Sequence, residues 1–217
     1  MKKIVITSQK GGSGKTTLAA HLSVEAERCG DKPVWLIDTD KQGTLSLWHE
    51  RREQDTPQRA DIPLAHLARG LERLAGEGAA YCFIDTAPTI SDQTASLIDL
   101  ADLVLIPVRP SPADLWSIAE TVTLVKEANT RFLFVVTQAK PQANITAQTV
   151  AALSQHGPVA EAFIGDRVPY AVAMTGGRTA PDLSAKSPAA DEISALWGCV
   201  KSCFHESMKR KRKVAHG

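Results

Sequence analysis

The chain has 217 residues, of which 43% are hydrophobic and 23% charged, and its net charge is +1. Such a length and composition are typical of one globular α/β domain with a substantial core. Apolar runs such as residues 103–108 and 132–136 are far too short to span a bilayer, and no cleavable hydrophobic region follows the N-terminal lysines. We therefore expect a soluble, cytoplasmic protein.

Repeated strand–helix units are predicted along the chain. In chain order they are a strand at 4–7, a helix at 14–29, a strand at 33–38, a helix at 45–52, a polar loop at 51–63, a helix at 64–74, a strand at 81–85, a helix at 92–100, a strand at 103–108, a helix at 112–128, a strand at 131–137, and helices at 146–155 and 189–208. The strands are continuously apolar, which favours a parallel sheet covered on both faces. We predict a single-domain α/β P-loop NTPase fold, a doubly wound and mostly parallel sheet, over residues 1–208, with a basic tail at 209–217.

A glycine-rich loop, SQKGGSGKTTL at residues 8–18, follows the first predicted strand and opens the first helix. The common phosphate-loop pattern G-x-x-x-x-G-K-[ST] needs glycine at position 9, where this chain has Gln9, followed by an additional lysine, Lys10. Backbone N–H groups of such a loop and the N-terminus of the following helix form a cradle for phosphate. Lys15 would contact the β- and γ-phosphates, and Thr16 would offer its hydroxyl to Mg²⁺. The predicted ATP-binding residues are Lys10, Gly11, Gly12, Ser13, Gly14, Lys15, Thr16 and Thr17.

Three aspartates stand at the ends of predicted strands. Asp38 and Asp40 lie at the end of the second strand, and Asp85 ends the strand at 81–85. The carboxyl ends of parallel strands meet at one edge of the sheet, so these acids should lie beside the phosphate loop. Carboxylate oxygens suit Mg²⁺ and its waters, which makes the three residues candidates for the metal and the attacking water.

Several segments together resemble the ParA/MinD family of deviant Walker ATPases, and are most similar to small ParA partition proteins without an N-terminal helix-turn-helix domain. These segments are KGGSGKTT at 10–17, DTDKQ at 38–42, FIDTAP at 83–88, LIPVRPSPADLWS at 105–117, and residues 167–197. The resemblance extends over nearly the whole chain. It implies an ATPase that uses ATP and Mg²⁺ and forms a homodimer with ATP.

The resemblance also implies a role for individual residues. Lys10 would be the signature lysine, which reaches across the dimer into the partner's nucleotide site and offsets phosphate charge there, as an arginine finger does. Asp40 would orient or activate the attacking water, Asp38 would support the metal and the switch region, and Asp85 would hold Mg²⁺ through a water. The family often has proline after the second aspartate, where this chain has Lys41, so the resemblance does not determine the shape of that loop. Adenine contacts are expected after residues 134–140 and near 167–169.

Family members of this type bind DNA without sequence preference when ATP is bound, so we expect nucleoid association and a strong dependence on salt. The DNA-binding candidates are Arg167, Arg178, Lys186, Lys209, Arg210, Lys211, Arg212 and Lys213. Residues 209–213 were expected to form a flexible cluster, with a purely solubilising end as the alternative. The apolar stripe of the last helix is expected to pack on the core, so no membrane binding is predicted.

The favoured function is DNA segregation, in which a cargo-bound ParB-like partner stimulates hydrolysis. One alternative keeps the ATPase and changes the cargo to a protein assembly, such as a carboxysome or a chemoreceptor cluster, or to a MinD-like spatial regulator. A metallocluster protein would need paired cysteines at a dimer interface, and the scattered Cys29, Cys82, Cys199 and Cys203 do not fit that class. A nucleotide-dependent regulator without turnover is the last alternative.

Overall fold

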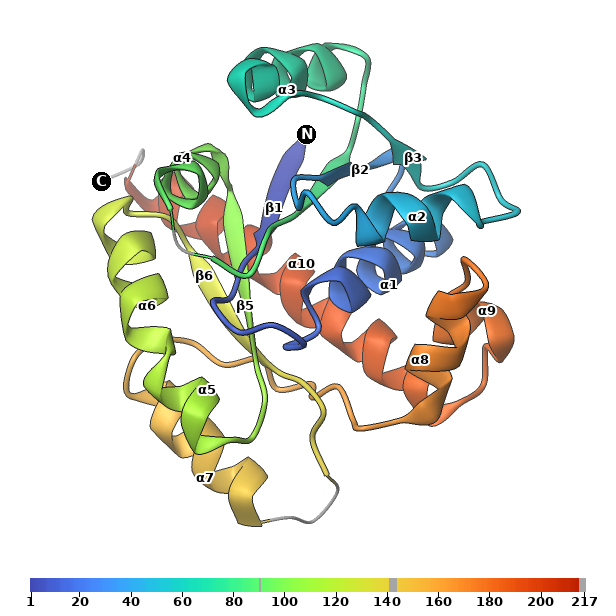
Figure 1. The fold of residues 1–217 in the computed structure, drawn as a ribbon. Helices are drawn as coiled ribbons and strands as arrows, with labels where there is room; N and C mark the ends of the chain where they lie inside the picture. The colour runs from blue at the N-terminus through green and yellow to red at the C-terminus, as the bar shows by residue number, and fades with distance from the viewer. Residues whose placement is uncertain (90, 141–143, 215–217) are drawn as a thin grey trace.

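The computed structural model describes residues 1–89, 91–140 and 144–214, with side chains up to His205. Six parallel strands form one sheet in the order β3-β2-β4-β1-β5-β6 (Figure 1). The strands are β1 Lys2–Ile6, β2 Val34–Asp38, β3 Gln58–Arg59, β4 Tyr81–Asp85, β5 Leu103–Val108 and β6 Phe132–Val136. The predicted parallel, doubly wound fold is confirmed.

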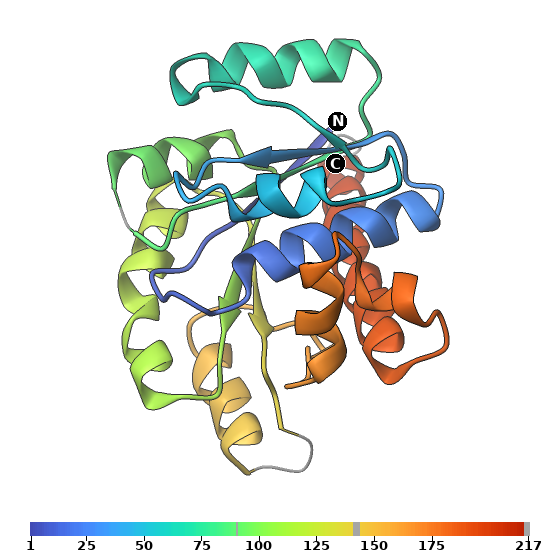
Figure 2. The same cartoon turned by 45° about the vertical axis from the view of Figure 1, so that its right-hand side comes forward.

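Helices cover both faces of the sheet. Their bounds are α1 Lys15–Arg28, α2 Thr44–Glu50, η1 Leu64–His66, α3 Leu67–Gly76, α4 Asp92–Leu100, α5 Pro112–Trp116, α6 Ile118–Glu127, α7 Asn144–Ser154, α8 Val168–Thr175, α9 Ala180–Leu183 and α10 Pro188–Val214. Helices α1 and α10 pack on one face, and α3, α4 and α6 on the other (Figure 1, Figure 2). Successive side chains of a strand point to opposite faces, so Ile4 and Ile6 pack with α1 while Val5 packs with α4.

The register of the central strands brings the carboxyl ends of β1, β2 and β4 to one level. Asp38 at the end of β2 is paired with Asp85 at the end of β4, and Asp85 is paired with Ile6 at the end of β1. The phosphate loop leaves β1 at this edge and leads into α1. The two acids and the loop therefore lie together because three parallel strands end at one level.

The structure differs from the sequence prediction in several elements, including α8 and α9, where no helix was predicted. The polar loop at 51–63 contains β3, a two-residue edge strand too short for an apolar pattern. The helix predicted at 112–128 is divided at Ser117, whose hydroxyl donates to the carbonyl of Asp114 at 2.8 Å and competes with the helical hydrogen bonds. Helix α10 extends to Val214, so residues 209–213 lie in its last turns and not beyond it. Within the described residues, no helix is both long and apolar enough to cross a bilayer.

Candidate functional site

The loop between β1 and α1 is held from behind by the end of β6. Gly14 precedes α1 with a φ of 96°, a left-handed conformation that side-chain-bearing residues rarely adopt, and the Cβ of any other residue would face Thr137. The Thr137 hydroxyl donates to the carbonyl of Ser13 at 2.8 Å, and the Gln138 amide donates to the carbonyl of Gly12 at 2.7 Å. These bonds orient the loop so that the N-terminal N–H groups of α1 are available to an anion.

Lys15 lies inside this loop with only 7% of its surface exposed. Its ammonium donates to the carbonyl oxygens of Ser8 at 3.2 Å and Lys10 at 3.3 Å. Burial lowers the pKa of Lys15, while the charges of Asp85 and Asp40 oppose that shift. The loop therefore holds a positive charge at the place where phosphate oxygens are expected.

Asp85 and Thr16 form the acidic side of the site. The Thr16 hydroxyl donates to Asp85 Oδ2 at 2.6 Å, and Asp85 is 1% exposed. Burial is the main cause that raises the pKa of Asp85 to about 7, opposed by the hydrogen bond from Thr16. The second oxygen, Oδ1, is buried and has no hydrogen-bond partner among the described residues. An unpartnered buried carboxylate oxygen fits a metal-bound water as its missing partner.

Asp38 shapes the loop that carries Asp40. Its two carboxylate oxygens accept from the backbone N–H groups of Asp40 at 3.0 Å and Ser46 at 2.9 Å. Asp40 in turn accepts from the backbone of Gln42 at 3.0 Å, and the N–H of Gly43 closes a turn onto the carbonyl of Asp40. Lys41 is exposed at the tip of this turn. The turn therefore forms with lysine at the position where related sequences often have proline.

Lys10 is partly exposed and precedes the exposed Gly11 and Gly12. Its backbone amide bonds to the Ser8 hydroxyl at 3.4 Å and its carbonyl accepts from Lys15. The Lys10 ammonium has no hydrogen bond or ion pair with any residue that the structure describes. This side chain is therefore free to contact a second molecule.

A cavity of about 210 Å³ adjoins the loop between α1 and the segment 164–171. It is lined by Gly14, Thr17, Leu18, Thr137, Gln138, Ile164, Gly165, Asp166, Arg167, Tyr170 and Ala171. This is the region in which adenine contacts were expected. Sequence inspection did not identify Thr137 and Gln138 as loop-holding residues; their only sequence signal is that they follow the last strand.

The three DNA-binding candidates whose side chains the structure describes lie in different parts of the fold. Arg167 lines the cavity beside the loop and pairs with Glu192 at 2.8 Å. Arg178 follows the far end of α8 and lies 3.8 Å from Glu53, whereas Lys186 is exposed after α9. The side chains of 209–213, at the end of α10, lie outside the described residues.

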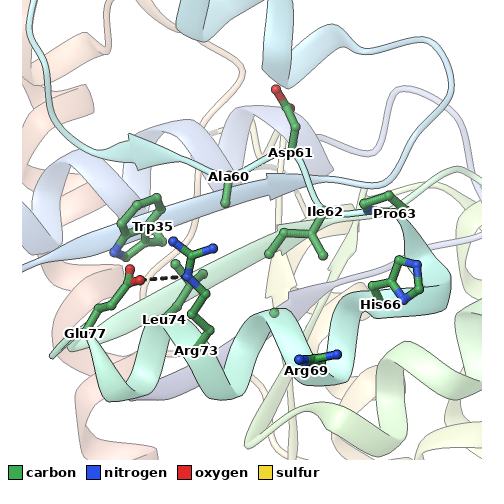
Figure 3. A pocket seen from close by; sticks show the side chains of 11 residues that line it. Trp35, Ala60, Asp61, Ile62, Pro63, His66, Arg69, Arg73, Leu74 and Glu77 are labelled. Atoms are coloured by element: carbon green, nitrogen blue, oxygen red, sulfur yellow. Dashed lines mark hydrogen bonds and ion pairs between the residues drawn. The ribbon is translucent and has the colours of Figure 1, made fainter.

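A second hollow, of about 510 Å³, lies at the β3 edge of the sheet beneath α3 (Figure 3). Trp35 and Ile62 form part of its apolar floor, and Arg73, which pairs with Glu77 at 2.8 Å, lies across it. None of its lining residues belongs to the glycine-rich loop or to the acids at the strand ends. It is separate from the site described above.

Comparison with known proteins identifies the family of this chain. The sequence profile of the CobQ/CobB/MinD/ParA nucleotide binding domain matches residues 4–178. Maintenance of carboxysome distribution protein A of Halothiobacillus neapolitanus is 27% identical over 203 residues, which cover 89% of this chain and 93% of that protein. Protein ParA of Rhizobium radiobacter is 30% identical over 129 residues, 58% of this chain and 57% of ParA. The crystal structure of the cell division ATPase MinD of Pyrococcus furiosus superposes with a TM-score of 0.77 at 20% identity, covering 93% of this chain and 98% of that one.

Proposed function

The chain belongs to the CobQ/CobB/MinD/ParA nucleotide-binding family, and on this basis we propose that it hydrolyses ATP to ADP and phosphate as a dimer that forms when ATP is bound. The observation that carries the proposal is the pair of lysines on one loop. Lys15 is buried and donates to two loop carbonyls, whereas the Lys10 ammonium has no hydrogen bond or ion pair with any residue that the structure describes. One lysine serves the loop's own nucleotide and the other is available to the nucleotide of a second copy.

Each residue of the site has a task in this reaction. Lys15 and the N-terminal N–H groups of α1 bind the β- and γ-phosphates, as electrostatic catalysis of phosphoryl transfer requires. Thr16 and Asp85, with Asp38 nearby, would hold Mg²⁺, which supplies positive charge to the phosphates. Within the described residues no group of three or more His, Cys, Asp or Glu could hold a metal alone, which suits an ion that is completed by phosphates and waters. Asp40 orients the attacking water, and Lys10 of the second copy stabilises the developing charge.

The first candidate cargo is DNA. In this proposal the ATP-bound dimer binds DNA without sequence preference, associates with the nucleoid, and is released when a ParB-like partner stimulates hydrolysis. Arg178, Lys186 and the cations at 209–213 are exposed or terminal positions that could meet phosphates. The similarity to a ParA protein supports this candidate.

A protein assembly is the second candidate cargo. One relative, which matches 89% of this chain, is named for the maintenance of carboxysome distribution, and that name favours positioning of a protein body by the same ATPase cycle. A pulldown with the Asp40→Ala variant in ATP, followed by sequencing of bound DNA and identification of bound protein, separates the two cargoes. Recovery of a DNA-bound adaptor supports the first candidate, and recovery of an assembly protein without one supports the second.

The ATPase proposal is tested with two lysine variants. Lys15→Ala should lose ATP binding, whereas Lys10→Ala should bind ATP yet release phosphate at least about tenfold more slowly and stay monomeric, since the cation supplied in trans is gone. Phosphate release, nucleotide titration and light scattering after size exclusion measure these effects. Lys126→Ala, an exposed change on α6, is the control and should behave as the unmodified protein. Normal turnover and dimerisation of Lys10→Ala would refute the trans role.

A further inference from the structure

Glu192, in the first turns of α10, holds the segment that follows β6 and its loop. Its carboxylate accepts from the backbone N–H of Gly165 at 3.0 Å and from Arg167 Nε at 2.8 Å. The hydroxyl of Tyr170 is 2.8 Å from the same carboxylate and 3.1 Å from the carbonyl of Ala189. Burial, followed by the hydrogen bond to Glu192, raises the pKa of Tyr170, so its hydroxyl keeps its proton for donation. One side chain therefore organises three groups spread over six residues.

The three groups that Glu192 holds all line the cavity beside the phosphate loop. Gly165, Arg167 and Tyr170 face Gly14 and Thr17 across it. Glu192 is not among the residues that line this cavity; together with Gly165 and Arg167 it lines a neighbouring hollow beside α7. It therefore acts through the cavity wall, by which we mean residues 165–170, and does not itself contact the space that a nucleotide would occupy.

The cavity wall is also attached to α1, the helix that follows the phosphate loop. Tyr170 packs edge-on against His21 of α1, with ring centroids 5.1 Å apart. His21 Nδ1 lies 2.8 Å from the carbonyl of Thr17, and its Nε2 accepts from the backbone N–H of Ala180 at 2.9 Å. The spacing between the wall and the phosphate loop is thus set by Glu192 on one side and by His21 on the other.

We propose that Glu192 is a positioning residue for the base and ribose end of the nucleotide, through its hold on Gly165, Arg167 and Tyr170. This inference rests on the proposed function as a nucleotide-binding ATPase, and it assigns Arg167 to the nucleotide pocket and not to DNA. Loss of the carboxylate frees the Arg167 guanidinium and leaves the Gly165 N–H without its acceptor. The phosphate loop has its own supports, Thr137 and Gln138, and keeps its shape.

The test compares ligands that use different parts of the site. Calorimetric titration of Glu192→Ala with Mg–ADP should show an affinity about tenfold below that of the unmodified protein, as expected for the loss of a charged acceptor. Magnesium pyrophosphate, which contacts only the phosphate loop, should bind within about twofold of normal. In steady-state hydrolysis the KM for ATP should rise while kcat is preserved, because Lys10, Lys15 and Asp40 are untouched.

Two further variants separate positioning from general loosening. Glu192→Gln keeps one carbonyl acceptor, so it should bind Mg–ADP with intermediate affinity, and it serves as the test protein if Glu192→Ala does not fold. Asp191→Ala removes an exposed acid from the same turn and should leave both affinities unchanged. Unaltered Mg–ADP affinity in the Glu192 variants, or an equal loss for pyrophosphate, overturns the proposal. Failure of the unmodified protein to bind Mg–ADP would instead contradict the proposed function itself.

Discussion

His21 lies on α1 one turn after Thr17, and its side chain is uncharged, unlike those of the lysines of the loop. Burial is the main cause that lowers its pKa from 6.5 to about 4, with smaller opposing contributions from its bond to the Thr17 carbonyl and from Asp182. Its Nε2 accepts from Ala180 N–H, so the ring is neutral with its proton on Nδ1, directed at Thr17. A neutral imidazole thus links the helix of the phosphate loop to the segment before α9.

This histidine should make the fold sensitive to mild acid. Between pH 6.5 and about 4 the unfolded chain binds a proton at this position and the folded chain does not. The free energy of unfolding therefore falls as the pH is lowered through that window. The loss attributable to His21 should reach about 3 kcal/mol, since each pKa unit corresponds to about 1.4 kcal/mol. Urea unfolding at a series of pH values measures it.

Comparison with substituted proteins isolates the contribution of His21. His21→Gln should be less stable at pH 7 but lose less further stability between pH 6.5 and 4. His156→Gln, at an exposed histidine, should keep the pH dependence of the unmodified protein. If His21→Gln and the unmodified protein lose stability in parallel, His21 is not the titrating group.

At the scale of elements, α2 is attached to the segment between α8 and α9. The indole N–H of Trp48 donates to the carbonyl of Arg178 at 3.0 Å, and Arg52 donates to the carbonyl of Gly177 at 3.2 Å and to Asp182 at 2.8 Å. Gly177 has a φ of 68°, and a Cβ there would lie 2.4 Å from the backbone of Arg51. The C-terminal end of α2, the helix that follows the Asp40 loop, is therefore anchored by packing that admits only glycine at position 177.

Arg52 should be the main stabilising residue of this attachment. Its side chain is 4% exposed, and Arg52→Ala would remove the side-chain donor to the Gly177 carbonyl and one of the three donors to Asp182 Oδ2, the other two being the backbone N–H and hydroxyl of Thr179. We expect a loss of about 1.5 kcal/mol in the free energy of unfolding, because a charged hydrogen bond is lost while Asp182, an exposed residue, keeps the two donors of Thr179. Arg51→Ala, which removes an exposed side chain that donates to the Leu47 carbonyl, should cost less than about 0.5 kcal/mol. Urea unfolding measures the free energy of unfolding of both variants. Equal losses for Arg52→Ala and Arg51→Ala would contradict the role assigned to Arg52.

At the scale of the whole molecule, α10 connects the candidate nucleotide site with the basic cluster at 209–213. Its first turns carry Glu192 against the nucleotide pocket wall, and its middle packs through Ile193, Trp197 and Val200 into the core, as the predicted apolar stripe required. Its last turns carry the five cations at 209–213. One continuous helix therefore extends from the candidate ATP site to the strongest concentration of positive charge in the sequence.

Removal of residues 209–217 should weaken DNA retention by the ATP-bound protein. If all five cations contact phosphates, the slope of log affinity against log salt should become shallower by about 4, because each contact releases counterions. Fluorescence anisotropy with a labelled duplex at several salt concentrations measures the slope. Removal of residues 215–217 alone eliminates no lysine or arginine and should have no effect. An unchanged slope after the longer deletion would assign the cluster to solubility.

The sequence by itself determined the parallel α/β fold, the phosphate loop and the grouping of Asp38 and Asp85. Each of these depends on a short run of consecutive residues, and parallel strands necessarily end at one edge of the sheet. Only the tertiary structure decided which side chains support the site. Thr137 bonds to Ser13, His21 to Ala180 and Arg52 to Asp182 across separations of 124, 159 and 130 residues. Such partners are selected by packing between helices and strands that meet only in the folded chain, and no local pattern of residues encodes them.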